Sequence, residues 1–118
     1  MTFAEKYNEL KQKYAAAADF SAVGHNLAAE ITLTDEDAGG TFYVAWLDGK
    51  LSIEPYRYYD NTVSIRIGSD LLEALLQGKK NPVNEFLLGN LEAEGESADA
   101  LALIDAMKQK KRPRKKSE

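Results

Sequence analysis

The sequence predicts an α+β fold in which a mostly antiparallel, five-stranded sheet is covered on one face by helices. Two observations support this prediction. Apolar residues recur at helical spacing near the N-terminus and again after residue 69, and five short segments have the patterns of strands. Because four of the five strands are grouped together between the first helix and the later helices, the helices are expected to pack together on one side of the sheet.

The first element is a helix that begins beside Thr2. Thr2 and Glu5 match a capping box, in which the two side chains satisfy backbone N–H groups at the helix start. The alanines at 15–18 extend this helix, which we expect to end near Asp19. Its apolar stripe consists of Phe3, Tyr7, Leu10 and Tyr14.

Four of the strands are predicted from side-chain pattern. Residues 27–33 and 62–67 alternate apolar and polar side chains, which is typical of half-buried strands. Residues 41–47 are apolar on both faces, which favours a central position in the sheet. The last strand is predicted at 88–94.

The fifth strand is predicted from turn chemistry. Asp48-Gly49 is a type I′ hairpin signal, because both residues can adopt a positive φ. It joins the segment at 41–47 to a returning strand at 50–54. Pro55 either ends this strand or confines it to an edge, since proline cannot donate to the sheet.

Three helical segments form the C-terminal half. Ser69 or Asp70 is expected to cap the first, and Gly78 to end it. Asn81-Pro82 begins a single helical turn through Phe86 and Leu87. Ser97 is expected to cap the last helix. The inward-facing residues are Leu71, Leu72, Leu75 and Leu76 in the first segment and Ala100, Leu103, Ile104 and Met107 in the last.

Length and charge predict one domain with a basic tail. The chain has 118 residues, and the segment 108–118 holds seven of the fifteen Lys and Arg with one acid, giving +6 against −10 for 1–107. We therefore predict a folded domain at 1–107 and a disordered tail at 108–118, which has too few apolar residues to bury. There is no cysteine, no signal peptide pattern and no peroxisomal ending, so we expect a cytoplasmic protein.

Catalytic and metal-binding patterns are weak. His25 is the single histidine and has the context of a loop residue. The acidic run 35–37 lacks calcium-loop spacing and is expected to be a solvated turn. The alternating Glu92, Glu94 and Glu96 are expected on the solvent side of a strand. The sequence thus predicts a protein that is not an enzyme and uses no cofactor or metal.

Two blocks of the sequence resemble the sterol carrier protein family, in its sterol carrier protein 2 branch. The first is the aromatic strand and hairpin at 42–50. The second runs through Gly78-Lys79, Pro82, Phe86, Gly89 and Gly95, with the order of helix, turn and final strand found in that family. The resemblance covers roughly residues 20–107.

The resemblance implies an apolar tunnel between sheet and helices that binds or transfers a fatty acid, an acyl-CoA or another lipid without catalysis. For each matching residue, simple core packing remains an alternative. The residues that the resemblance assigns to the ligand-binding wall are Phe42, Val44, Trp46, Leu71, Leu75, Leu76, Phe86, Leu88, Leu101 and Ile104.

The sequence leaves other roles open. The same fold with a filled core would serve as a protein-interaction or oligomerisation module, and the oligomeric state is not predicted. The basic tail is suited to transient contact with an anionic membrane. It could also contact nucleic acid phosphates, although we do not expect nucleic acid to be the main partner. Arg57, Lys79 and Lys80 are candidates for contact with a ligand head group, with exposed loop positions as the alternative.

Overall fold

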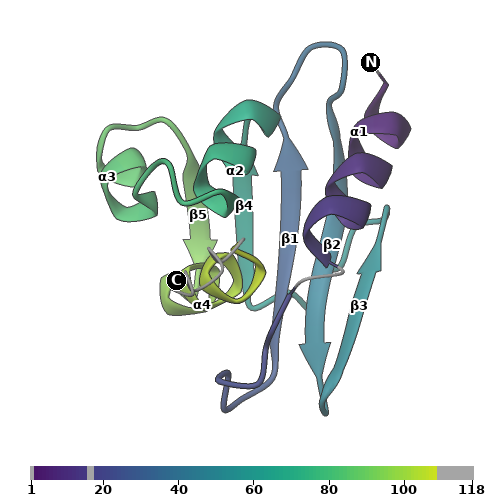
Figure 1. The fold of residues 1–118 in the computed structure, drawn as a ribbon, viewed down its shortest axis with the longest axis vertical. Helices are drawn as coiled ribbons and strands as arrows, with labels where there is room; N and C mark the ends of the chain where they lie inside the picture. Colours follow the sequence, from purple (N-terminus) through teal and green to yellow (C-terminus); the bar gives the residue numbers. More distant parts are fainter. Residues whose placement is uncertain (1, 16–17, 109–118) are drawn as a thin grey trace, which may run out of the picture.

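Figure 1 shows a computed structural model of the chain, in which residues 2–15 and 18–108 are described. The five-stranded sheet and its helical cover match the predicted α+β class. The elements are α1 (Phe3–Leu10), the π-helical turn η1 (Lys11–Ala15), β1 (Leu27–Leu33), β2 (Gly40–Leu47), β3 (Lys50–Glu54), β4 (Val63–Ile67), α2 (Ser69–Leu76), α3 (Pro82–Leu87), β5 (Glu92–Gly95) and α4 (Ser97–Met107).

The strands lie in the order β3-β2-β1-β4-β5. Three neighbouring pairs are antiparallel, and β1 with β4 is the parallel pair, so the prediction of a mostly antiparallel sheet is confirmed. β1 occupies the middle of the sheet. β2, for which a central position was predicted, has strands on both sides but lies one place from the centre.

The β2–β3 hairpin forms as predicted. Asp48 and Gly49 both have positive φ, 53° and 78°, which is the requirement of a type I′ turn. β3 ends at Glu54, directly before Pro55, and is an edge strand. Proline therefore stands where the sheet needs no further donor.

Helices cover one face of the sheet. Figure 1 shows α1, α2 and α4 in front of the strands, with α3 further out beyond β5. The residues that point toward the helices are buried at the centre of β1, β2, β3 and β4, including Ile31, Val44 and Ile65. The opposite face is covered in part by the loop after β3. There the Glu30 carboxylate accepts hydrogen bonds from the Tyr58 backbone at 2.9 Å and from Arg57 at 3.4 Å.

The helical region at the N-terminus is shorter than predicted. The capping box of Thr2 and Glu5 is present, and α1 follows it. The helix has π-helical geometry over Lys11–Ala15, and Ala18 already lies outside it. Residues 16–17 of the predicted extension lie outside the described residues, as do residues 109–118 of the predicted tail.

The first turn of α2 is capped differently from the prediction. Ser69 is the first helical residue rather than the cap, and the N-cap is Gly68. The acceptor is Asp35, from the turn after β1, whose carboxylate binds the Ser69 backbone N–H and hydroxyl. At α4 the predicted cap Ser97 is likewise the first helical residue, and Glu96 is the N-cap. Both helices thus begin one or two residues earlier than predicted and lack the predicted capping bond.

The boundaries predicted for the last strand are wrong. It was predicted at 88–94, but β5 begins at Glu92. Gly89 has a φ of 82° and ends α3, while the Asn90 N–H bonds to the Glu85 carbonyl at 2.9 Å. Together with the bond from the Gly89 N–H to the Phe86 carbonyl at 3.0 Å, this bond forms a Schellman motif, which satisfies the carbonyls at the end of α3 and directs the chain away from a strand. Gly78 ends α2 in the same way, as predicted.

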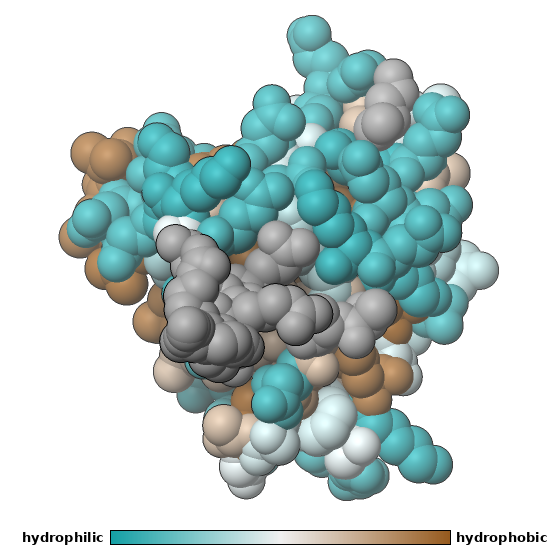
Figure 2. Space-filling view, viewed as in Figure 1, coloured by the Kyte–Doolittle hydropathy of each residue, from teal (hydrophilic) through white to brown (hydrophobic). Residues whose placement is uncertain are grey.

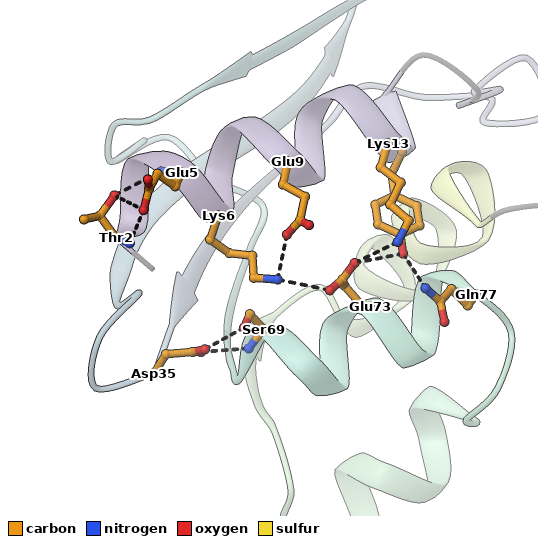
Figure 3. A network of polar contacts seen from close by, with 10 residues as sticks. Thr2, Glu5, Lys6, Glu9, Lys13, Asp35, Ser69, Glu73 and Gln77 are labelled. Atoms are coloured by element: carbon orange, nitrogen blue, oxygen red, sulfur yellow. Dashed lines mark hydrogen bonds and ion pairs between the residues drawn. The ribbon is translucent and has the colours of Figure 1, made fainter.

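A polar network fixes α2 against α1 (Figure 3). Lys6 contacts Glu73 at 3.1 Å, and Glu73 also contacts Lys13 at 3.4 Å and the Tyr14 hydroxyl at 3.3 Å. Burial raises the pKa of Glu73, but the hydrogen bond and charge of Lys6, followed by those of Lys13, outweigh burial and hold the pKa below its usual value. The carboxylate is therefore ionised where α1 and α2 meet.

Candidate functional site

An apolar pocket of about 270 Å³ lies between the β1–β4–β5 side of the sheet and the helices α2, α3 and α4. Every strand and helix around it contributes aliphatic or aromatic groups, and Ser97 is the polar residue among those described at its wall. The lining residues are Ile31, Ile65, Ile67, Leu72, Leu75, Pro82, Val83, Phe86, Leu87, Leu91, Ala93, Ser97, Ala100, Leu101, Leu103 and Ile104.

The pocket opens between α3 and α4. Its deep wall is formed by buried residues such as Ile67 and Leu103, whereas its exposed lining residues belong to these two helices. Leu87 is 75% exposed, Phe86 is 47% exposed and Leu101 is 41% exposed. Figure 2 shows hydrophobic residues gathered at the left of the molecule, where Figure 1 places α3. The gap between α3 and α4 is thus bordered by partly exposed apolar side chains.

The position of the inner wall follows from the strand pattern. Ile31, Ile65 and Ala93 occupy neighbouring positions in register across β1, β4 and β5, and all three point toward the helices. On the helical side of the pocket, Asp35 holds the start of α2, and the contact of Glu73 with Lys6 holds its middle. The polar contacts therefore lie around the pocket and leave its interior apolar.

No protein-family model matches the sequence, and no curated protein matches it significantly. Solved structures match along nearly the whole chain. Palmitated SCP2L2 from Aedes aegypti has a TM-score of 0.65 at 12% identity, with 92% of this chain and 96% of that chain covered. The ubiquinone synthesis protein UbiJ-SCP2 has a TM-score of 0.63 at 9% identity, with 89% and 87% covered. The chain has the fold of sterol carrier protein 2.

The same fold also occurs as part of a longer chain. The sec-alkylsulfatase Pisa1 from Pseudomonas sp. matches with a TM-score of 0.71 at 15% identity, over 83% of this chain. This chain spans 16% of the sulfatase chain. A sterol-carrier-protein-2 fold is thus found both as a single domain and within an enzyme of several times its length.

Four of the ten residues predicted for the wall line the pocket of this sterol-carrier-protein-2 fold. They are Leu75, Phe86, Leu101 and Ile104. Three others line a second, smaller cavity of about 20 Å³ that lies toward α1, namely Phe42, Val44 and Leu76. Contact between any of these residues and a ligand stays a prediction.

The remaining three predicted residues line neither cavity. Trp46 stacks on Phe20, with ring centroids 5.2 Å apart, and so packs beneath the loop that precedes β1. Leu71 is half-buried against the core. Leu88 is 70% exposed, because it is the C-cap of α3 instead of a strand residue.

Sequence reasoning missed much of the pocket wall. Ile65, Ile67 and Leu91 lie in segments predicted as strands, but a strand pattern does not distinguish a pocket wall from filled core. Val83 and Leu87 lie on the helical turn that had been predicted. Their exposure was the missing signal, and it appears only in three dimensions.

The head-group candidates separate into two places. Arg57 bonds to Glu30, whose side chain points away from the pocket because strand residues alternate between faces. Lys79 and Lys80 are exposed in the link between α2 and α3, which both line the pocket. Of the three candidates, the two lysines are the ones adjacent to pocket-lining helices.

The single histidine lies outside the pocket and has a structural partner. His25 contacts the buried Asp99 carboxylate at 2.7 Å and thereby joins the loop before β1 to the first turn of α4. The described residues contain no group of three or more His, Asp or Glu that could hold a metal ion. Among them, no helix is both long and apolar enough to cross a membrane.

Proposed function

We propose that this protein binds a hydrophobic ligand, such as a fatty acid, an acyl-CoA or another lipid, in the pocket beneath α2, α3 and α4. The observation that carries the proposal is a pocket of about 270 Å³ whose described lining is apolar except for Ser97. Ligand pockets typically begin at about 300 Å³, so this one is close to the size needed for a small ligand or part of a longer one.

The pocket volume sets a scale for the ligand. A group the size of a water molecule takes about 30 Å³, so the pocket accommodates roughly nine methylene-sized groups. Burying nine methylenes releases roughly 7 kcal/mol of gross transfer free energy, before the cost of ordering the chain and the ligand. A medium-length acyl chain therefore fits as it stands, and a longer chain needs further space or leaves one end outside.

The comparisons support the same class of ligand. One structure with this fold is described as palmitated, and its fold covers almost the whole of both chains. The open end between α3 and α4, with Lys79 and Lys80 near it, gives a carboxylate or phosphate head group access to solvent and positive charge.

The proposed function contains no catalytic step. Apart from Ser97, the described lining side chains are aliphatic or aromatic, and such groups solvate a ligand but supply neither a nucleophile nor a proton donor to it. We also propose that the protein is cytoplasmic and that it carries lipid between partners there.

Two measurements test the proposal. Organic extraction of the purified protein followed by mass spectrometry should release a lipid in near-stoichiometric amount. A fluorescent medium-chain fatty acid should bind the delipidated protein saturably and be displaced by unlabelled fatty acid. Absence of both lipid and binding would contradict the proposal and favour a protein-interaction module.

A pair of alanines in α4 gives a matched test. Ala100 is 8% exposed and lines the pocket, whereas Ala98 is exposed and does not line it. Ala100→Leu should fill part of the pocket and weaken fatty-acid binding by tenfold or more. Ala98→Leu should leave binding unchanged. Equal binding by both variants, with folding confirmed by circular dichroism, would show that the ligand lies elsewhere.

A further inference from the structure

We infer that α3 and its flanking residues form a docking surface for membranes that contain anionic phospholipids. The inference rests on the proposed function, because a lipid-binding pocket gives the membrane contact its purpose. It specifies where the protein meets a lipid source and which side chains make the contact.

The first argument is exposed apolar area. Leu87 and Leu88, at the end of α3, are 75% and 70% exposed, and Val83 and Phe86 are 46% and 47% exposed. These four residues lie within six positions of one another, and three of them, Val83, Phe86 and Leu87, line the pocket. Contiguous exposed apolar surface of this kind marks a contact site, since water solvates it poorly.

The second argument is charge. Between Gly78 and Leu91 the exposed charged residues are Lys79 and Lys80. The one acid in that segment, Glu85, is 8% exposed and accepts a hydrogen bond from the Asn90 side chain at 2.8 Å. The surface around α3 therefore presents apolar and positive groups together, which suits anionic head groups above an acyl layer.

A third argument comes from the end of α4. The Lys108 side chain lies 3.8 Å from where a Cβ on Gly78 would stand, so it is beside the Lys79–Lys80 pair. Six further Lys and Arg residues follow Lys108 in the sequence within residues 109–118. The basic segment of an otherwise acidic chain thus begins beside the C-terminal end of α2, the end that leads into α3.

The charge pattern favours a bilayer over a second copy of the chain. Two copies that met through this face would bring their lysines together, and like charges across an interface oppose association. An anionic bilayer instead offers complementary charge for the lysines and an apolar acyl layer for Leu87 and Leu88. The exposed acids that follow, Glu92 and Glu94, lie on β5 beyond the buried Leu91, and Glu92 pairs with Arg66 at 3.6 Å.

The contact also explains how ligand would exchange. α3 packs only lightly on the other described elements, and its side chains form the outer lip of the pocket. Insertion of its leucines into the bilayer interface would turn the mouth toward the acyl layer. A lipid would then pass between bilayer and pocket with little exposure to water.

The test is co-sedimentation of the full chain with vesicles of phosphatidylcholine alone or of phosphatidylcholine mixed with phosphatidylglycerol. We expect binding to the mixed vesicles that weakens as salt is raised. Changing Lys79→Ser and Lys80→Ser together should lower the partition coefficient by about thirtyfold, at roughly 1 kcal/mol for each lysine. Changing Leu87→Ser and Leu88→Ser together should lower it by about tenfold or more. Lys50→Ser and Tyr59→Ser are exposed controls outside this surface and should have little effect.

The outcomes separate this inference from the proposed function. Leu88 lines neither cavity, so Leu88→Ser alone should lower vesicle binding and retain fatty-acid binding without vesicles, and this pattern supports the docking surface. Vesicle binding that is absent at low salt, or unchanged in the leucine variant, would overturn it. Self-association of the wild type that is lost in the leucine variant, without vesicle binding, would assign the face to a second copy instead. Absence of fatty-acid binding together with normal vesicle binding would reject the pocket proposal alone.

Discussion

Asp35, in the turn after β1, accepts two hydrogen bonds from Ser69, one from the backbone N–H at 2.8 Å and one from the hydroxyl at 2.5 Å. N–H groups in the first turn of a helix have no partner within the helix, and the helix dipole favours negative charge there. The carboxylate meets both needs from a segment 34 residues away in the sequence. It thereby fixes the start of α2, which supplies Leu72 and Leu75 to the pocket.

Replacing this carboxylate should destabilise the fold. We expect Asp35→Ala to lower the free energy of unfolding by about 1–2 kcal/mol, the usual cost of losing a helix cap. Urea denaturation at pH 7 measures the change. Glu36→Ala removes an equal charge at the neighbouring exposed position and should alter stability by no more than about 0.5 kcal/mol.

The contribution of Asp35 should depend on pH. Burial raises the pKa of this carboxyl, but hydrogen bonds from the Ser69 side chain and backbone outweigh burial and hold the pKa below its ordinary value of 3.8. Because the folded pKa is depressed, the stabilisation is fully present above 3.8 and is lost as the pH falls through the folded pKa. The difference between wild type and Asp35→Ala should therefore shrink in that range. A difference that stayed constant there would contradict the carboxylate's role.

Glu73 should matter more than Glu9, although both contact Lys6. The Glu73 side chain is 17% exposed and also meets Lys13, whereas the Glu9 side chain is 44% exposed. Exposed ion pairs contribute about 0–1 kcal/mol, and partly buried networks more. We expect Glu73→Gln to lower the unfolding free energy by about 1–2 kcal/mol and Glu9→Gln by less than about 0.5 kcal/mol. Equal losses in thermal or chemical denaturation would show that burial does not distinguish the two contacts.

The parts of the fold that were predicted correctly from the sequence are those set by the preferences of neighbouring residues. The Asp48-Gly49 turn, the edge position of β3 before Pro55 and the end of α2 at Gly78 each follow from the backbone preferences of one or two residues. The start of β5 could not be predicted in this way, because the segment 88–91 is apolar enough for a strand. Its hydrogen bonds to Glu85 and Phe86 decide instead for a helix end.

The site was harder to predict because a pocket is the absence of atoms. Leu75 and Ile104 line the main pocket, while Leu76, next in sequence to Leu75, faces the smaller cavity. Helical periodicity predicts that both leucines point inward and gives no information on the space beyond them. The cap of α2 was unpredictable for a related reason, since Asp35 and Ser69 meet only after the sheet forms.

Leu103 should control the length of the ligand that the pocket accepts. Ile31, Leu72 and Leu103 line both the main pocket and the smaller cavity, so their side chains separate the two spaces. Leu103→Ala should join them and raise the relative affinity for long-chain over medium-chain fatty acids by about fivefold or more, since each buried methylene contributes about 0.8 kcal/mol. A displacement series of fatty acids of increasing length measures this ratio.

The control for this change must lose core packing without opening the wall. Leu103 and Leu33 are 1% and 2% exposed, and Leu33 lines neither cavity. Both substitutions to alanine should lower the unfolding free energy by about 2–5 kcal/mol. The shift in chain-length preference is expected for Leu103→Ala alone. The same shift in Leu33→Ala would attribute it to general loosening of the core.

Phe86 should control how fast the ligand leaves. Its ring is 47% exposed and lines the mouth of the pocket, so it would cover a bound ligand without belonging to the buried core. Phe86→Ala should increase the dissociation rate of a fluorescent fatty acid several-fold in stopped-flow measurements, because side chains at a pocket mouth limit exchange. Stability should change by less than about 1 kcal/mol, since the ring is half in solvent.

Tyr59→Ala removes an aromatic ring that is 80% exposed and outside the pocket, and it should leave the rate unchanged. If both variants release the ligand at the wild-type rate, the ligand leaves by a route other than the gap between α3 and α4, and the mouth assigned to the pocket is wrong.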